Sequence, residues 1–164
     1  MVFEFSKYVV DIDVDKTKGF YCKAPLVSDG CSCAGCRNYE KAIDHLSLEV
    51  VSFFDQFGIE MKKVCEVYVN CANVDNSILY GGFYHLCGKI ISGESAWIPT
   101  SPNTKHLDED EMFSIAKDFK VSFQEECALL ADDFPTPAIQ LEVLGNIPWV
   151  LEERNIFADD YINE

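Results

Sequence analysis

The sequence predicts an α+β domain with a mainly antiparallel sheet, one long amphipathic helix packed on a face of it, and a cysteine-rich loop before that helix. Apolar residues recur at helical spacing from Asn38 to Phe57, whereas other runs, most clearly Val64 to Ala72, alternate between apolar and polar. The first pattern indicates a helix with one apolar face, and the second indicates half-buried strands. Because short turns separate the alternating runs, we expect antiparallel pairing, with the helix covering one face.

A single domain spanning residues 1–164 is expected. The chain has 164 residues, of which 48% are apolar, including 12 Phe and 7 Tyr. A chain of this length buries about 70% of the surface that its unfolded form exposes, which is enough for a core without disulfide or metal support. The sequence contains neither an obvious linker nor an internal repeat.

The predicted helix begins at Asn38 and ends at Phe57. Asn38 is a favourable N-cap residue, and Gly58 suits the left-handed position after the last turn. Ile59 can make the apolar contact that often follows such a turn. The apolar stripe of the helix consists of Tyr39, Ile43, Leu46, Val50, Phe53, Phe54 and Phe57.

The expected strands are an irregular opening strand over residues 3–14, a hairpin of Val64–Ala72 and Ile78–Ile91, a strand at Phe119–Gln124 and a final strand at residues 139–143. Gly81 and Gly82 mark a bulge or a close approach of another backbone. Residues 108–118 are ambiguous, because the acidic run Asp108–Glu111 resembles a helix start while later residues alternate like a strand. Trp149 is expected to be buried and to anchor the C-terminal segment.

Four cysteines follow one another closely as Cys22-x8-Cys31-x-Cys33-x2-Cys36. A structural zinc site uses four thiolate or imidazole ligands and often includes two cysteines separated by two residues. Cys33 and Cys36 have that spacing, and Cys31 and Cys22 can complete the tetrahedron. The sequence therefore predicts a structural zinc ion bound by Cys22, Cys31, Cys33 and Cys36.

Two alternatives to zinc stay open for these cysteines. They can be unligated thiols, or Cys33 and Cys36 can cycle between dithiol and disulfide, helped by the positive end of the helix that follows. A different cysteine can also replace Cys22 as the fourth ligand, the remaining ones being Cys65, Cys71, Cys87 and Cys127.

The sequence favours a cytoplasmic location. Residues 1–15 alternate in polarity and include Asp11, Asp13 and Asp15, unlike the basic and then continuously apolar start of a signal peptide. No run of eighteen or more apolar residues occurs, so no membrane-spanning helix is expected. In a reducing compartment, eight cysteines are better explained as thiols and metal ligands than as disulfides.

Most of the formal net charge of −15 lies near the C-terminus, where residues 108–164 carry 15 acidic and 3 basic side chains. Such a surface repels phosphate backbones, and only Arg37 and Arg154 offer the bidentate phosphate contacts of arginine. Nucleic-acid binding is therefore not expected. The charge would attract a basic protein partner, although it would also serve solubility alone.

Five segments together carry a resemblance. They are Tyr21-Cys22, the run CSCAGCRNY from Cys31 to Tyr39, YGGFYH from Tyr80 to His85, PAIQLE from Pro137 to Glu142, and IPWVL from Ile147 to Leu151. This combination resembles a group of small uncharacterised bacterial proteins and covers most of the chain. The resemblance implies a bacterial cytosolic protein with a cysteine-rich loop, and it brings no activity with it.

No familiar catalytic motif is present: the chain lacks a Walker loop, a nucleophile elbow, a metalloprotease helix and a dinucleotide fingerprint. His85 could act as a metal ligand or pair with a cysteine, but a histidine between Tyr84 and Leu86 is more simply a hydrogen-bonded residue of the core.

Three functions remain. The sequence favours a non-enzymatic, zinc-stabilised, protein-binding module, for example an immunity-type inhibitor of a basic toxin. The second function is a thiol redox protein or sensor that uses Cys33 and Cys36. The third is a small-molecule binder lined by Tyr80, Phe83, Tyr84 and His85.

Overall fold

The computed structural model describes residues 1–161, which form a seven-stranded sheet with helices on one of its faces. The sheet has the order β1-β2-β4-β9-β8-β7, with β3 added beside β4, and every pair is antiparallel. Its strands are β1 (Val2–Phe5), β2 (Tyr8–Ile12), β3 (Glu66–Ala72), β4 (Ile78–Ser92), β7 (Phe113–Ala116), β8 (Phe119–Gln124) and β9 (Ala138–Ile147). A separate hairpin consists of β5 (Trp97–Ser101) and β6 (Thr104–Leu107).

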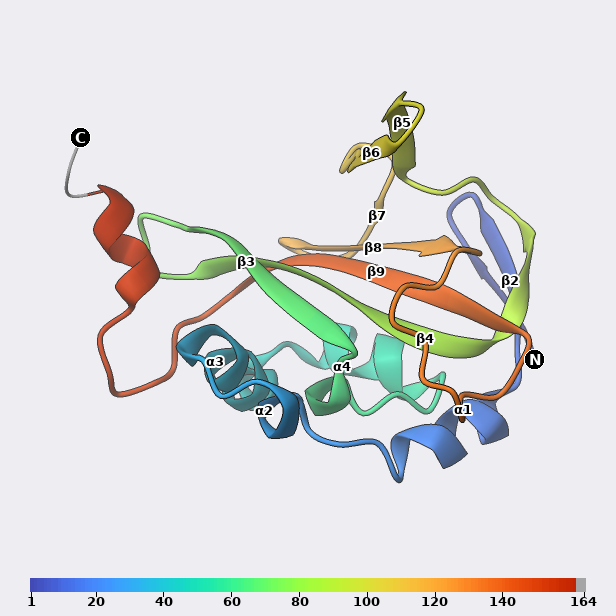
Figure 1. Cartoon of the computed structure of the whole chain (residues 1–164), viewed down its shortest axis with the longest axis horizontal. Coiled ribbons are helices and arrows are strands. Elements are labelled where there is room, and N and C mark those ends of the chain that lie inside the picture. The colour runs from blue at the N-terminus through green and yellow to red at the C-terminus, as the bar shows by residue number, and fades with distance from the viewer. Residues whose placement is uncertain (162–164) are drawn as a thin grey trace.

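The four α-helices gather below the sheet in Figure 1, and the β5–β6 hairpin projects above it. The α-helices are α1 (Val14–Tyr21), α2 (Val27–Gly30), α3 (Ala34–Ala42) and α4 (Leu48–Asp55). The 3₁₀ turns are η1 (Ile43–His45), η2 (Met61–Lys63) and η3 (Ile156–Tyr161). The core lies between these helices and one face of the sheet, where the Phe54 ring packs against Tyr84 and Phe119.

The mainly antiparallel sheet is confirmed, but the single long helix is wrong. The predicted helix is two helices, α3 and α4, because the backbone at Leu46 and Ser47 is extended, with ψ angles of 156° and 154°. The Ser47 hydroxyl accepts a hydrogen bond from the Val50 N–H at 3.4 Å and so caps α4. The apolar stripe continues across the break because both helices bury their apolar side against the same core.

The predicted end of this helical region is confirmed. Gly58 has a φ of +78°, and a β-carbon there would lie 2.6 Å from the β-carbon of Lys18. Ile59 is buried, and its N–H bonds to the carbonyl oxygen of Phe54 at 3.2 Å, as in a glycine-terminated helix.

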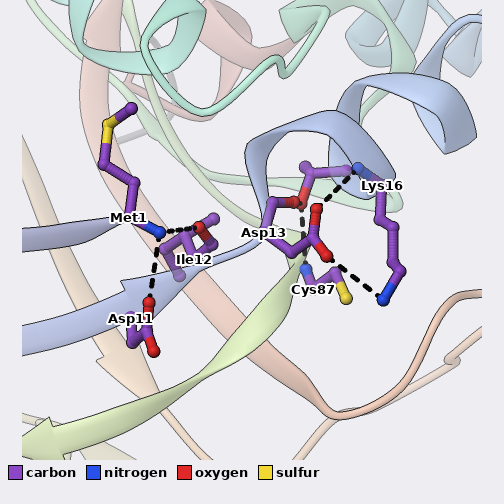
Figure 2. Close-up of polar contacts among 7 residues, drawn as sticks. Met1, Asp11, Ile12, Asp13, Lys16 and Cys87 are labelled. Carbon is purple, nitrogen blue, oxygen red and sulfur yellow. Dashed lines mark hydrogen bonds and ion pairs between the residues drawn. The ribbon is translucent and has the colours of Figure 1, made fainter.

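The opening segment contains more elements than its sequence pattern indicated. The chain reverses at Ser6, which has a φ of +52°, so β1 and β2 form a hairpin in place of one irregular strand. Helix α1 begins at Val14, and its N-cap is Asp13, whose carboxylate accepts from the Lys16 N–H at 3.0 Å (Figure 2). Neither α1 nor α2 was expected from the sequence.

The β3–β4 hairpin is confirmed, and its glycines allow a close approach. A β-carbon on Gly82 would lie 2.6 Å from the carbonyl oxygen of Glu66, and one on Gly81 would lie 2.4 Å from the ring of Tyr68. The register shift of this hairpin lies between Val69 and Cys71, not at the glycines.

Residues between the hairpin and the C-terminus were predicted in part. The bounds of β8 match the prediction, and β9 is longer than predicted. The acidic run at Asp108 begins no helix, since the segment after it is strand β7. Trp149 is half-buried, and its indole N–H donates to the carbonyl oxygen of Glu153 at 2.8 Å.

Helix α1 completes an open edge of β4. On that edge β3 pairs with residues 78–83 and β2 with residues 88–92, which leaves His85 and Cys87 without a strand partner. The Tyr21 hydroxyl bonds to both the N–H and the carbonyl oxygen of His85, each at 3.0 Å. The Thr17 hydroxyl accepts from the Cys87 N–H at 3.0 Å. Buried backbone N–H and carbonyl groups need hydrogen-bond partners, and in this stretch the side chains of Tyr21 and Thr17 supply them in place of a strand.

Replacing Tyr21 by phenylalanine is expected to lower the free energy of unfolding by about 2 kcal/mol, because the buried backbone groups of His85 lose their partner. Urea denaturation measures the change. Tyr68→Phe is the matched control, since Tyr68 is partly exposed and its change should stay within about 0.5 kcal/mol. Equal effects of the two substitutions would contradict the proposed role of α1.

Candidate functional site

Three cysteines meet between α2 and α3. Cys31 directly follows α2, and its N–H bonds to the carbonyl oxygen of Val27 at 3.1 Å. Cys33 is the N-cap residue of α3, with its sulfur accepting from the Cys36 N–H at 3.4 Å. Cys36 lies in the first turn of α3 and is only 7% exposed. The predicted N-cap, Asn38, instead lies inside α3 and is fully buried.

The three sulfur atoms are spaced as ligands of one metal ion would be. They lie within 4.8 Å of one another, and the sulfurs of Cys31 and Cys33 are 3.3 Å apart. Tetrahedral zinc with Zn–S bonds of about 2.3 Å needs sulfur separations of about 3.8 Å, so small side-chain adjustments suffice. Within residues 1–159, no other group of three or more His, Cys, Asp or Glu side chains is arranged in this way.

The fourth predicted ligand, Cys22, does not belong to this group. Cys22 is exposed and forms the C-cap of α1. The other candidates for the fourth position are also outside the group, namely Cys65, Cys71, Cys87 and Cys127. The structure therefore brings together three of the four predicted ligands, Cys31, Cys33 and Cys36.

Contacts to distant parts of the chain hold the cysteine loop in place. Arg37 donates from Nε to the carbonyl oxygen of Ser32 at 3.0 Å, and its guanidinium pairs with Glu153. The Tyr80 hydroxyl donates to the carbonyl oxygen of Gly35 at 2.8 Å. A β-carbon on Gly35 would lie 3.2 Å from Cγ2 of Val69, so β3 packs closely against this turn.

The cysteines differ in acidity. Hydrogen bonding from the Cys33 backbone, and then from the Cys33 and Cys36 thiols, holds the pKa of Cys31 below its ordinary value. Burial raises the pKa of Cys36 far above its ordinary value. Burial thus favours the protonated thiol of Cys36 and opposes the effect of the positive end of α3. Metal binding would have to displace that proton, which makes the metal affinity pH-dependent.

A pocket of about 440 Å³ adjoins the cluster, and both Cys31 and Cys36 line it. Its other walls come from Phe20 and Tyr21 of α1, residues 24–27, Gly30, residues 63–67 before and at the start of β3, His85, and the loop residues Leu129 and Ala131. Most of these side chains are apolar. The volume is within the range of small-molecule pockets, about 300 to 1,000 Å³.

His85 is a buried residue that also lines this pocket. It is 3% exposed, it lies between the rings of Phe83 and Phe134, and its Nε2 is 3.2 Å from Oε1 of Gln140. Tyr80 and Tyr84, which were grouped with His85 as candidate binding residues, do not line the pocket. They lie in the core instead, where the Tyr84 hydroxyl donates to the carbonyl oxygen of Met61 at 2.7 Å.

A row of polar side chains is buried on the sheet face opposite the helical core. Glu142 is 1% exposed and accepts from the amides of Gln140 and Gln124 at 2.5 and 2.6 Å. Burial raises the pKa of Glu142 above its ordinary value. The alternation of the last strand places Gln140 and Glu142 on one face, but it does not show that this face is buried.

We expect the buried His85 to make stability depend on pH. Burial holds the pKa of its imidazole below the ordinary value of 6.5, so the unfolded chain takes up the proton first as the pH falls. The contribution of His85 to the free energy of unfolding is therefore complete above about pH 6.5, and it decreases as the solution is acidified through that value. Urea denaturation between about pH 7.5 and about pH 5.5 measures this slope.

The control for this measurement is a second histidine. His85→Gln should lose the decrease on acidification, whereas His106→Gln should keep it because His106 is exposed. The raised pKa of Glu142 acts in the opposite direction, because it makes stability rise as the pH falls. The slope of unfolding free energy against pH in each variant is therefore compared with the slope of the wild type. The same slope in His85→Gln and the wild type would contradict the prediction.

A second groove, near the start of the chain, has its polar groups paired internally. The α-amino group of Met1 contacts Asp11 at 3.1 Å and the carbonyl oxygen of Ile12 at 2.7 Å, as Figure 2 shows. Asp13 pairs with Lys16 at 3.1 Å, and its N–H bonds to the carbonyl oxygen of Cys87 at 2.8 Å. These contacts join β2, α1 and β4. Because the polar groups are paired with one another, we assign the groove a structural role.

Comparison with known proteins does not extend this picture. A scan against protein-family models, a search of curated proteins and a search of solved structures each returned no match. No helix in the described part of the chain has the length and apolarity needed to cross a membrane. Since fold alone does not define function, the functional argument depends on the chemistry of the cysteine site.

Proposed function

We propose that the protein is a zinc-binding module in which Cys31, Cys33 and Cys36 hold the metal and which acts by binding another protein rather than by catalysis. The supporting observation is that three sulfur atoms lie within 4.8 Å of one another, in a loop that Arg37 holds through a hydrogen bond to the carbonyl oxygen of Ser32. Thiolates are soft ligands, which favour zinc over magnesium and calcium, the ions that prefer oxygen ligands.

The metal would stabilise the start of α3 and its contacts to β3. Gly35 and Cys36 lie in the first turn of α3, and Gly35 packs directly against Val69. An ion bound by thiolates before and inside this turn would fix the loop, because metal-binding energy in such loops is also folding energy. The zinc would thus be structural even though the domain has its own core.

A basic protein is the proposed partner. The acidic excess of residues 108–164 supports it, and the acidic residues with exposed side chains there include Glu109, Asp110, Glu111, Glu125, Glu126, Asp132 and Asp133. An immunity-type inhibitor of a basic toxin is one concrete form. Such binding is expected to weaken steeply with added salt, because exposed charges are screened within about 10 Å at 0.1 M salt.

Elemental analysis tests the metal site directly. Protein purified under reducing conditions, without a histidine tag, should contain one zinc ion per chain. In denaturant, where burial protects no thiol, all eight cysteines should react with a thiol reagent. In the folded protein, a chelator should raise the number of thiols that react with the reagent, because it releases Cys31 and Cys33. Protein that contains no zinc and cannot be loaded with it would contradict the proposal.

A thiol redox function is the second candidate, and the 3.3 Å separation of the Cys31 and Cys33 sulfurs supports it. The sequence spacing indicated Cys33 and Cys36 as the redox pair, whereas this distance favours Cys31 and Cys33. A small-molecule disulfide would oxidise the pair by exchange, forming the Cys31–Cys33 bond and releasing two thiols. Mass analysis after equilibration with oxidised glutathione would show this bond as a loss of two hydrogens per chain.

A further inference from the structure

The proposed zinc site is incomplete within the described residues, and its open side adjoins a pocket. Three sulfurs converge, and no fourth His, Cys, Asp or Glu donor joins them among residues 1–159, whose side chains the structure describes. Zinc sites with three protein ligands keep a fourth position for water or an exogenous group, whereas closed structural sites use four protein ligands. The open position therefore requires a ligand from outside the cluster.

Two of the three cysteines connect the site to this pocket. Cys31 and Cys36 both line the 440 Å³ space, so an ion held by their sulfurs would lie at its wall. Apolar side chains make up most of the rest of the lining, with Val27, Val64 and Val67 among them, and the charged residues Lys63 and Glu66 also border it. A molecule in the pocket would thus meet apolar surface along its body and the metal at one end.

We propose that the pocket binds a small apolar thiol whose sulfur becomes the fourth ligand of the zinc. This inference rests on the zinc site proposed above. On binding, the thiol proton would pass to solvent and the thiolate would replace water on the metal, so that no oxidant or reductant is needed. Binding of that thiol would then change the geometry of the cysteine loop, so the module would act as a sensor of the thiol.

The charge and softness of the site select a thiol over other head groups. The chain has a formal net charge of −15, and the bound thiolates add negative charge locally. Lys63 lines the pocket but is paired with Glu60 at 2.9 Å, and Glu66 lines it as well, so carboxylates and phosphates are repelled on approach. A thiol approaches uncharged and loses its proton only at the metal. Sulfur also matches the soft character of a three-thiolate site.

Cobalt-loaded protein and three probes test the proposal. Benzyl mercaptan has both the apolar body and the sulfur, benzyl alcohol lacks the sulfur, and 2-mercaptoethanol lacks the apolar body. Benzyl mercaptan should raise the sulfur-to-cobalt charge-transfer absorbance to saturation. It should bind at least about tenfold more tightly than 2-mercaptoethanol, because its ring is buried in the pocket. Benzyl alcohol should not raise this absorbance.

Two substitutions locate the binding site. Ala131→Trp fills the pocket from an exposed position and should weaken benzyl mercaptan binding at least about tenfold. Val74→Trp is the matched control, because Val74 is fully exposed in the β3–β4 turn, and it should leave binding unchanged. The comparison of the three probes on the wild type does not depend on either variant folding correctly.

Cys22→Ser separates an open site from a closed one. With a three-cysteine site, this variant should keep the wild-type metal content and cobalt spectrum. Lost metal or weaker charge-transfer absorbance would make Cys22 the fourth ligand and overturn the inference, while leaving the zinc module intact. Equal binding of benzyl mercaptan and 2-mercaptoethanol, or no response to either, would overturn it as well. A wild type that takes up neither zinc nor cobalt would instead overturn the proposed function.

Discussion

Replacing Asn38 by leucine is expected to lower the free energy of unfolding by about 3 kcal/mol. Its side chain is fully buried and makes three hydrogen bonds. The amide donates to the Tyr80 hydroxyl at 3.2 Å and to the carbonyl oxygen of Pro148 at 3.1 Å, and its oxygen accepts from the Val150 N–H at 2.7 Å. Leucine has a similar size but satisfies none of these partners, and each buried unpaired group costs about 1 to 3 kcal/mol.

These bonds join three distant parts of the chain. Asn38 lies in α3, Tyr80 in β4, and Val150 in the segment after β9. We therefore expect Asn38→Leu also to loosen the C-terminal segment, which amide hydrogen exchange at Val150 and its neighbours would detect.

Asn70→Leu is the matched control for urea denaturation. Asn70 is exposed on β3, so this substitution should change the free energy of unfolding by less than about 0.5 kcal/mol. A loss below about 1 kcal/mol for Asn38→Leu would contradict the importance of the three bonds.

Asn38 also shows where the sequence pattern was insufficient for the helices. An asparagine ahead of an apolar stripe is a sound N-cap signal, but the same side chain can bond across the fold, and only tertiary structure decides between the two. The stripe itself was identified correctly. The break at Ser47 was missed because two short helices that face one core preserve the helical spacing of their buried residues.

The strands were easier to predict than the site. Alternation located β3, β8 and β9, and the turn after β3 located β4 as its hairpin partner. Cys31, Cys33 and Cys36 are close in sequence, so a short loop brings them together. The pocket combines residues from α1, β3, β4 and the loop near Leu129, and no local pattern could show that these meet.

Replacing Cys33 by serine is expected to lower zinc affinity by a factor of at least about 100, because one of three thiolate ligands is lost. Cys33 has two roles, since its sulfur belongs to the cluster and also caps α3 through the Cys36 N–H. Serine is a favourable N-cap residue, so the substitution removes the ligand and keeps the cap. The stability of the metal-free protein should therefore stay within about 0.5 kcal/mol of the wild type.

Loss of the ligand should appear as loss of the stability that zinc adds. At a free zinc concentration about 100 times the dissociation constant, the wild type gains about 2.7 kcal/mol, and Cys33→Ser should gain much less under the same conditions. Competition with a chromophoric chelator measures the affinity, and thermal unfolding with and without chelator measures the gain. Cys71→Ser is the matched control, because Cys71 is a half-buried cysteine outside the cluster. If Cys33→Ser and Cys71→Ser bind zinc equally well, the metal is not held by the loop before α3, and the chemical basis of the proposed module is lost.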